Sequence, residues 1–493
     1  MPFLPTTLKE LNFNQPDFIL VSVDAYVDHP SFGHAIISRL VEYHGFSIAI
    51  IPQPQTDAEY TALGEPKYGF LVSGGVVDSM VNNYTVAKIK RTTDSYSEGG
   101  KVGRIPDRAL TVHTKNLRRL FPKTAILIGG IEASLRRFAH YDYWSNCVMP
   151  TLLQDAPADL LLYGMGETTI KAILDLAKKG VPLKKIREVA GTAYLEKPIN
   201  LSKKLQKQIE SGDVITMPSF GEVCSDKKKY VEAFNIQYKN SEHVCAKPLI
   251  QRHGKLVLVA NPPQAPLDSD ALDLTYTLPY MRDYHPMYKE GVPSLTEVKF
   301  SLTATRGCFG ACNYCAITMH QGRIISKRSK QSLITEATEL TTKSDFKGYI
   351  HDVGGPTANF RNPPCAKQAT HGSCDNKTCI GFTPCKNLKA DHSEYMDILR
   401  ALRNIDGVKK VFVRSGIRFD YLMMDSNVKS ILKELVEHHI SGQLKVAPEH
   451  CIDSVLKVMN KTPFRVYKEF SKLYRDINKE RGKEQFLVPY LIS

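Results

Sequence analysis

Short apolar runs alternate with longer amphipathic segments through the N-terminal part of the chain. The pattern predicts buried strands separated by helices, which together form an α/β domain around a parallel, doubly wound, Rossmann-like sheet. Ligands of such sheets bind at the carboxyl ends of the strands, where Gly129-Gly130 and Gly164-Met165-Gly166 follow two of the runs. The predicted strands cover residues 17–23, 47–51, 69–73, 125–128 and 159–163.

A second alternation of strand-like and helical segments occupies the C-terminal part. Four strand–helix units and a fifth strand predict a parallel β/α barrel or open sheet, with its chemistry on the loops after the strands. We therefore expect an N-terminal sheet domain over residues 1–195, a connecting region over 196–295 and a second α/β domain over 296–493. The predicted strands of this last domain cover 298–302, 348–352, 411–414, 443–446 and 486–492, and its helices lie near 329–342, 393–404, 426–441 and 464–481.

Composition places the chain among ordinary globular proteins. Of its 493 residues 42% are hydrophobic and 24% are charged, which excludes a wholly disordered, collagen-like or coiled-coil chain. No apolar run has the ~18 residues of a membrane span, and the start of the chain lacks the pattern of a signal peptide, so we expect a cytoplasmic protein with no membrane partner. The net charge of +14 is compatible with nucleic acid or an anionic cofactor, and equally with a generally basic surface.

Seven of the eleven cysteines lie between positions 308 and 385. A reducing cytosol keeps thiols free, so clustered cysteines there indicate metal ligands or catalysts and not disulfides. The scattered cysteines are interpreted as small core residues: Cys147, Cys224, Cys245 and Cys451.

Three of the clustered cysteines have the spacing C-x3-C-x2-C, directly after the first strand of the second α/β domain. Cys308, Cys312 and Cys315 suit an iron–sulfur cluster, because thiolates are soft ligands that hold iron. A four-iron cluster would keep one iron without a protein ligand, open to a substrate or cofactor. Gly307 and Gly310 allow the backbone to fold tightly around a bulky group. The alternative is a structural zinc loop that recruits a distant His as its fourth ligand.

This motif, after the first strand of a partial parallel barrel, resembles the radical S-adenosylmethionine (SAM) superfamily. The resemblance implies that Cys308, Cys312 and Cys315 bind a 4Fe-4S cluster whose open iron is chelated by SAM. It implies that reduction cleaves SAM to a 5′-deoxyadenosyl radical, which abstracts hydrogen from a substrate. It further implies that Tyr314 lies against the adenine and that an electron donor such as flavodoxin or ferredoxin reduces the cluster.

In the same superfamily a glycine pair after the second strand meets the amino group of SAM. Gly354 and Gly355 occupy that place, although the acidic residue that usually follows the glycines is missing. The loops after the third and fourth strands offer further candidates for cofactor or substrate contacts. Each of these is equally interpretable as an ordinary loop residue: Ser415, Arg418, Glu449 and His450.

Three longer segments resemble the YgiQ family of bacterial radical SAM proteins, and the resemblance covers essentially the entire chain without implying a substrate. The radical SAM core has six strands and members of the family continue further, so a chain that stops at the fifth strand is expected to be truncated or split from a longer protein. The three segments are Val23-Asp24-Ala25-Tyr26-Val27-Asp28-His29-Pro30-Ser31-Phe32-Gly33, Gly129-Gly130-Ile131-Glu132-Ala133-Ser134 and Lys445-Val446-Ala447-Pro448-Glu449-His450.

The predicted N-terminal sheet also resembles the cobalamin-binding domains that precede many radical SAM cores. Those domains bind cobalamin through Asp, one residue, His, two residues and Gly. Here Asp28 and His29 are adjacent, and three residues separate them from Gly33. Because this shift moves the histidine relative to cobalt, we expect the sheet to lack cobalamin.

A Pro-rich insertion between the second strand and its helix carries four more cysteines with the spacing C-x8-C-x4-C-x5-C. Four thiolates could close a structural zinc site or hold an auxiliary cluster, and a metal would order a loop without regular structure. Free thiols are the alternative. The four residues are Cys365, Cys374, Cys379 and Cys385.

The leading hypothesis is a radical SAM enzyme whose substrate, catalytic acid or base and oligomeric state the sequence does not reveal. One alternative is a tRNA- or RNA-modifying enzyme similar to methylthiotransferases, which the Arg306-Gly307-Cys308 entry and the basic charge favour, although no separate RNA-binding module is evident. Another is a non-catalytic, zinc-stabilised nucleic-acid-binding protein. That alternative predicts zinc in place of iron and salt-dependent binding to RNA or DNA.

Overall fold

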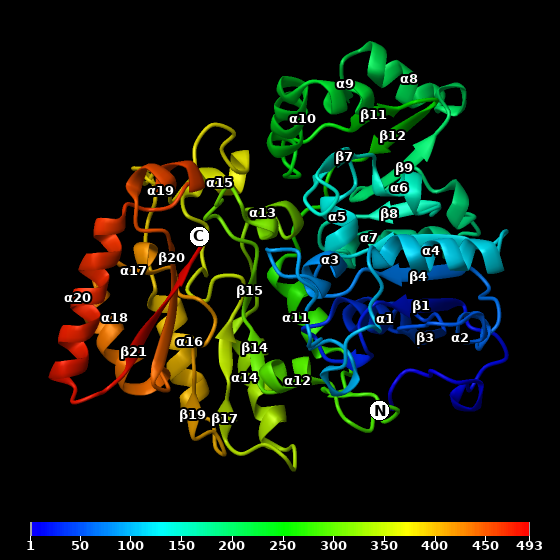
Figure 1. The fold of residues 1–493 in the computed structure, drawn as a ribbon. Helices are drawn as coiled ribbons and strands as arrows, with labels where there is room; N and C mark the ends of the chain where they lie inside the picture. The colour runs from blue at the N-terminus through cyan, green and yellow to red at the C-terminus, as the bar shows by residue number, and fades with distance from the viewer. Residues whose placement is uncertain (1, 493) are drawn as a thin grey trace. The chain divides into compact units, whose positions relative to one another are not determined.

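The structure, a computed structural model, describes residues 2–492 apart from the side chain of Ala369. The chain divides into two compact units, drawn in Figure 1. Unit 1 comprises residues 1–265 and 278–296, and unit 2 comprises residues 266–277 and 297–493. Each unit has a hydrophobic core of its own.

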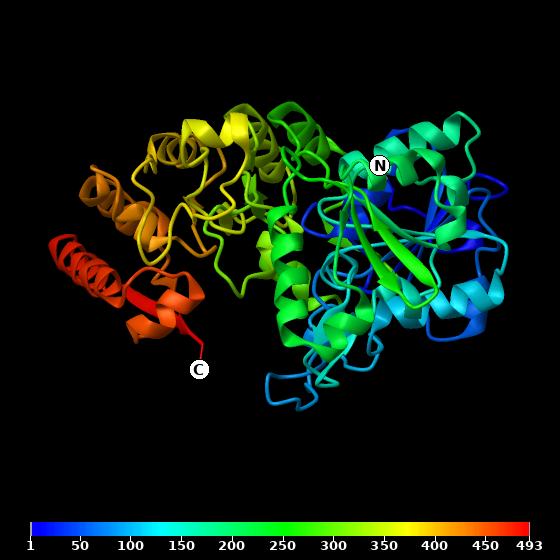
Figure 2. The ribbon, with the colours of Figure 1, turned by 90° about the horizontal axis from the view of Figure 1, so that it is seen from above.

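A nine-stranded sheet forms the centre of unit 1, in the order β10-β11-β12-β9-β8-β5-β4-β1-β3. The five strands from β8 to β3 are parallel, and they are buried because helices lie on both sides of them (Figure 2), with α1 packed against α7 and α2 against α4. The predicted doubly wound sheet is confirmed. These elements are β1 (Phe18–Ser22), β3 (Ile48–Pro52), β4 (Gly69–Ser73), β5 (Ala125–Gly129), β8 (Leu160–Leu162), α1 (Gly33–Tyr43), α2 (Asp57–Thr61), α4 (Ala109–Leu120) and α7 (Glu167–Lys178).

The parallel strands reverse their order once. From β1 the chain moves outward to β3 and then crosses back to β4 on the other side of β1. Such a reversal leaves a crevice outside the carboxyl ends of the two strands that flank it, and ligands of open α/β sheets bind there. In unit 1 the loops after β1 and β4 are therefore the expected place for a ligand.

The segment that we expected to connect the two domains extends this sheet. It contributes β10 (Ile215–Thr216), β11 (Leu249–His253) and β12 (Leu256–Ala260), and β12 pairs antiparallel with β9 (Thr192–Glu196). The apolar run of β12 is buried from Val257 onward, and its pairing satisfies the backbone groups that would leave β9 as an open edge.

Unit 2 contains short parallel strand pairs separated by helices, as the predicted partial β/α arrangement requires. The pairs are β14–β18, β17–β19 and β20–β21, and in the described part of unit 2 they do not join into a closed barrel. Their elements are β14 (Ser301–Thr303), β17 (Tyr349–Ile350), β18 (Asp352–Gly354), β19 (Lys410–Val411), β20 (Gln443–Glu449), β21 (Phe486–Leu491), α14 (Lys330–Thr341), α16 (Ser393–Arg403), α18 (Val428–Glu434) and α20 (Phe464–Glu480).

A small antiparallel hairpin follows β14 and separates the first strand of unit 2 from its helix. It consists of β15 (Thr305–Arg306) and β16 (Ser326–Lys327), and the chain between them contains α13 (Ala316–His320).

No helix in the described part of the chain is both long and apolar enough to span a membrane. The remaining elements are β2 (Val27–Asp28), β6 (His140–Asp142), β7 (Cys147–Met149), β13 (Asp283–Tyr284), α3 (Ser79–Asn83), α5 (Ile131–Leu135), α6 (Leu152–Asp155), α8 (Lys203–Glu210), α9 (Phe220–Ser225), α10 (Lys227–Lys239), α11 (Ser269–Thr277), α12 (Pro293–Val298), α15 (Ala366–His371), α17 (Phe419–Leu422) and α19 (Asp453–Met459), with short 3-10 or π turns at Leu8–Glu10, Glu98–Gly100, Leu183–Lys185, Pro198–Asn200 and Leu435–His439.

Candidate metal centre

The β15–β16 hairpin encloses the loop that carries Cys308, Cys312 and Cys315, which we call the cysteine triad. Gly307 opens the loop with φ of +81°, and a Cβ on it would lie 2.0 Å from the carbonyl oxygen of Ile324, so this turn requires glycine. The backbone N–H of Cys308 donates to the carbonyl of Gly322 at 3.0 Å. The loop is therefore closed at its base before any metal binds.

The three thiols of the triad are half-buried and share one environment. Burial raises the pKa of Cys315, and the neighbouring Cys308 and Cys312 raise it further. The Sγ atom of Cys308 lies 3.5 Å from Oγ1 of Thr357, and Sγ of Cys312 accepts a hydrogen bond from Nη1 of Arg418 at 3.5 Å. Three soft donors on one loop fit a cluster that takes three protein ligands.

Arg418, predicted as a candidate contact, lies at the triad. Its guanidinium is buried and forms a two-point ion pair with Asp420, at 2.9 Å and 2.7 Å. Burial raises the pKa of Asp420 and the guanidinium lowers it, with a net lowering. A Cβ on Gly310 would lie 2.3 Å from Nη1 of Arg418, so the missing side chain gives the guanidinium room to reach Cys312.

Glu449 and Tyr314 also lie beside the triad. Burial raises the pKa of Tyr314, and the charges of Cys312 and Glu449 raise it further, which places the ring next to both groups. Lys461 is buried with Nζ donating to the carbonyl of Ala447 at 2.7 Å and lying 3.8 Å from Glu449. Burial and the nearby Arg418 lower the pKa of Lys461.

His450 makes a local contact, because its Nδ1 accepts from the backbone N–H of Ile452 at 3.0 Å. Lys461 and Thr357 are not among the residues predicted from the sequence. Thr357 follows the predicted glycine pair by two residues, which is the signal that points to it. Lys461 follows no recognisable spacing, so only the fold brings it to the triad.

The predicted glycine pair packs against the strand that enters the triad loop. A Cβ on Gly355 would lie 2.3 Å from the carbonyl oxygen of Thr305, and one on Gly354 would lie 2.6 Å from Oγ of Ser415. Ser415 donates its backbone N–H, at 2.9 Å, and its hydroxyl to the carboxylate of Asp352, so this candidate has a structural role. Close packing against Ser415 and Thr305 therefore requires glycine at both positions.

The second cysteine set, Cys365, Cys374, Cys379 and Cys385, lies between β18 and α16, and all four thiols are half-buried. Burial, together with the charges of the other three members, raises the pKa of Cys379 to about 12, so all three lie within electrostatic range of it. A small apolar cluster links both cysteine loops: Phe309, Phe360, Ile380 and Tyr421 are buried in it, with Cys308 and Cys379 packed alongside.

Among residues 2–492, no group of three or more His, Cys, Asp and Glu side chains has the arrangement of a formed metal site. The donor sets nevertheless have the chemistry that such sites use, since each gathers soft thiols in one half-buried place.

The prediction for the four scattered cysteines is wrong. All are exposed instead of buried in the core, because they fall on loops or on the outer faces of short elements: Cys147, Cys224, Cys245 and Cys451.

The pair that we compared with a cobalamin motif is engaged inside unit 1. Asp28 forms a buried ion pair with Arg39. On His29, Nδ1 accepts from the backbone N–H of Ser31 and Nε2 lies 3.1 Å from Nη1 of Arg282. With both ring nitrogens in protein contacts, His29 does not fit the role of a cobalt ligand.

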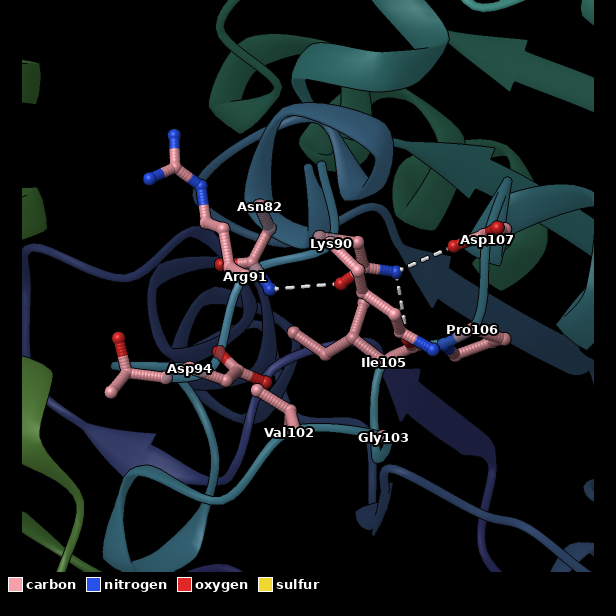
Figure 3. Close-up of a pocket in the computed structure, with 11 residues that line it drawn as sticks. Asn82, Lys90, Arg91, Asp94, Val102, Gly103, Ile105, Pro106 and Asp107 are labelled. Atoms are coloured by element: carbon pink, nitrogen blue, oxygen red, sulfur yellow. Dashed lines mark hydrogen bonds between the residues drawn. The ribbon is translucent and has the colours of Figure 1, made fainter. Parts of the chain in front are cut away.

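Unit 1 contains a separate hollow of about 300 Å³ on the connection from α3 to α4, which follows β4. Figure 3 shows Lys90 and Arg91 across the hollow from Val102 and Gly103. The predicted cysteines and glycines do not line it. Its lining residues run from the end of α3 to the loop before α4, and none lies in the loops directly after β1 and β4, where the strand order predicts a ligand. The other lining residues are Asn82, Asn83, Thr93, Asp94, Ile105, Pro106 and Asp107.

Comparison with known proteins adds three findings. Residues 1–301 match the family model described as radical SAM N-terminal. A UPF0313 protein of Clostridium botulinum is 53% identical over 500 aligned residues, which cover 100% of this chain and 76% of the relative, and one of Clostridium perfringens is 48% identical, covering 100% and 74%. The radical SAM methyltransferase TsrM of Kitasatospora setae, solved with tryptophan and a SAM analogue, is similar with a TM-score of 0.49 and 11% identity, covering 96% of this chain and 66% of TsrM.

Proposed function

This chain belongs to the UPF0313 family of radical SAM proteins, and from that membership we propose that Cys308, Cys312 and Cys315 hold a 4Fe-4S cluster at which SAM binds. The observation that carries the proposal is the closed β15–β16 loop, which gathers three half-buried thiols. When bound and reduced, the cluster and SAM together supply a 5′-deoxyadenosyl radical that abstracts hydrogen from a substrate.

The residues around the triad have complementary tasks in this proposal. Arg418 donates to the Cys312 sulfur and, with Lys461, offsets the negative charge of three thiolates. The superfamily resemblance assigns Gly354 and Gly355 to the amino group of SAM. Ser415 and Thr305 fill the space where their side chains would stand, so only the backbone groups of the pair are available for that contact. The ring of Tyr314, 44% exposed, provides a flat surface for the adenine.

The electron that reduces the cluster comes from a small donor protein such as flavodoxin or ferredoxin in this proposal. Support comes from the class of chemistry alone, since thiolate-bound clusters require a one-electron source. The full chain mixed with each reduced donor should produce 5′-deoxyadenosine faster than it does with the donor omitted.

The deciding experiment is anaerobic reconstitution of the full chain with iron and sulfide, followed by dithionite and SAM. We expect about four irons per chain at the triad and release of 5′-deoxyadenosine and methionine. The C308A/C312A/C315A variant should lose cleavage, whereas the C147A/C224A variant, altered at two exposed cysteines, should keep it. Iron-loaded protein that leaves SAM intact, or equal cleavage by the triad variant, would refute the proposal.

A further inference from the structure

The loop between β18 and α16 has little regular structure of its own. From Gly354 to Ser393 it contains one short helix, α15, within the described residues. Long irregular connections inside a compact unit are uncommon unless something orders them. The ends of this loop are pinned together, because the backbone N–H of Lys389 donates to the carbonyl of Pro364 at 3.0 Å.

Within this closed loop the four cysteines of the second set are held by backbone contacts. The N–H of Cys385 donates to the carbonyl of Cys379 at 3.0 Å, and the carbonyl of Cys374 accepts from Nη1 of Arg323 at 3.0 Å. The carbonyl of Cys365 accepts from the N–H of Gln368 at 3.2 Å, and Nε2 of Gln368 donates to the carbonyl of Arg323 at 3.3 Å. Arg323 therefore joins the turn of Cys365 to Cys374, and Cys379 and Cys385 are joined directly.

The rest of the chain provides an internal comparison. Cysteines outside the two sets are exposed, whereas all four members of the second set are half-buried. Packing alone does not explain this burial, since only Cys379 joins the apolar cluster around Phe309 and Ile380. A shared ligand explains it better, because reduced thiols gathered in one loop are the usual donors for zinc and for iron–sulfur clusters.

Asn460 ties this loop to the triad loop. Its Nδ2 donates to the carbonyl of Ala311 at 2.9 Å, and its Oδ1 accepts from Oγ1 of Thr378 at 3.0 Å. A Cβ on Gly381 would lie 2.3 Å from Oδ1 of Asn460, so the two loops meet closely at this residue. The second set is thus built into unit 2 next to the triad and is not a mobile appendage.

We propose that Cys365, Cys374, Cys379 and Cys385 hold a second metal centre, independent of the triad and closed by four thiolates. A centre with four protein ligands has no open position, so it stabilises the loop or relays electrons and does not bind SAM. The metal is a soft one that accepts four thiolates: a single zinc or the irons of an auxiliary cluster.

The test measures metal in the full chain, purified anaerobically with the triad removed by C308A/C312A/C315A. We expect this variant to retain about one zinc or about four irons per chain, and the identity of the metal distinguishes the two kinds of centre. Adding C365A/C374A/C379A/C385A should abolish the retained metal. Adding C147A/C224A/C245A/C451A instead, four exposed cysteines, should leave it unchanged.

A triad variant without zinc or iron would overturn the proposal. Because the seven-cysteine variant could fail to fold, thiol labelling of the folded triad variant provides a second measurement. The four second-set cysteines should resist N-ethylmaleimide until a chelator is added; equal labelling before and after chelation would also overturn the proposal. Neither measurement uses SAM, so a failure of SAM cleavage leaves both results interpretable.

Discussion

The contact between Gly355 and Thr305 makes a quantitative prediction about packing at the triad. In the G355A variant the new Cβ would lie 2.3 Å from the carbonyl oxygen of Thr305 and 2.7 Å from its Oγ1. The backbone at Gly355 has an ordinary φ, so alanine meets no conformational strain and the entire cost is steric. Since a backbone oxygen cannot move aside without moving β15, we expect a loss of about 1–3 kcal/mol, the usual range for overpacking.

Gly416 provides a matched control in the same unit. A Cβ at that position has no heavy atom within 4 Å, and its φ is ordinary as well. We expect G416A to change the free energy of unfolding by less than about 0.5 kcal/mol.

The assay is urea unfolding of the metal-free chain, followed by far-ultraviolet circular dichroism. With a urea dependence of about 2 kcal/mol per molar, a loss of 2 kcal/mol lowers the midpoint by about 1 M. Because the strain acts on the strand that enters the triad loop, G355A should also take up less iron on reconstitution. Equal midpoints for G355A and G416A would refute the steric reasoning.

Three further variants probe buried groups. Burial raises the pKa of Asp24 to about 7 from an ordinary 3.8, so between these values the folded chain holds a proton that the unfolded chain releases, and stability falls as pH rises. The free energy of unfolding of Asp24→Asn relative to the wild type should therefore rise with pH across this range, by at most about 4 kcal/mol, and stay constant above pH 7. A difference in urea midpoint that is constant from pH 4 to pH 8 would contradict this. Arg418→Met leaves Asp420 charged without its ion-pair partner and should lower the free energy of unfolding by about 3–5 kcal/mol. The double variant Arg418→Met/Asp420→Leu should recover most of that loss. Equal losses of stability in thermal melts of the two variants would argue against this reasoning. Phe309→Ala removes a ring stacked on Phe360 with centroids 3.7 Å apart and should cost about 3–5 kcal/mol in urea unfolding, so a loss below about 1 kcal/mol would show that the stack contributes little.

The sequence predicts the parallel strands of unit 1 well. Runs such as residues 48–51 and 125–128 are apolar without interruption, and only a strand covered on both faces buries such a run. The prediction is poorer at the start of unit 2. There the expected strand over 298–302 begins inside α12 (Pro293–Val298), and β14 starts only at Ser301, because a short apolar stretch fits either period.

Contacts around the triad show where prediction from the sequence ends. The loop itself could be predicted, since its three cysteines lie within eight residues of one another and their spacing carries the signal. Asn460 contacts Ala311 across a separation of 149 residues. No local pattern encodes such a contact, because it depends on how the strand–helix units of unit 2 close on one another. Burial is equally non-local, which is why the sequence alone misplaces the scattered cysteines in the core.

The β15–β16 hairpin has a consequence for affinity. In a free chain, bringing three thiols to one point would cost the entropy of closing the segment that joins them, in addition to the entropy of ordering each residue. The hairpin closes that segment during folding, together with Gly307 and the bond from Cys308 to Gly322. Less of the free energy of the thiolate–iron bonds is then offset by the entropy of ordering the loop, and the affinity for the metal is higher. The triad is preorganised in the same sense as a cyclised ligand.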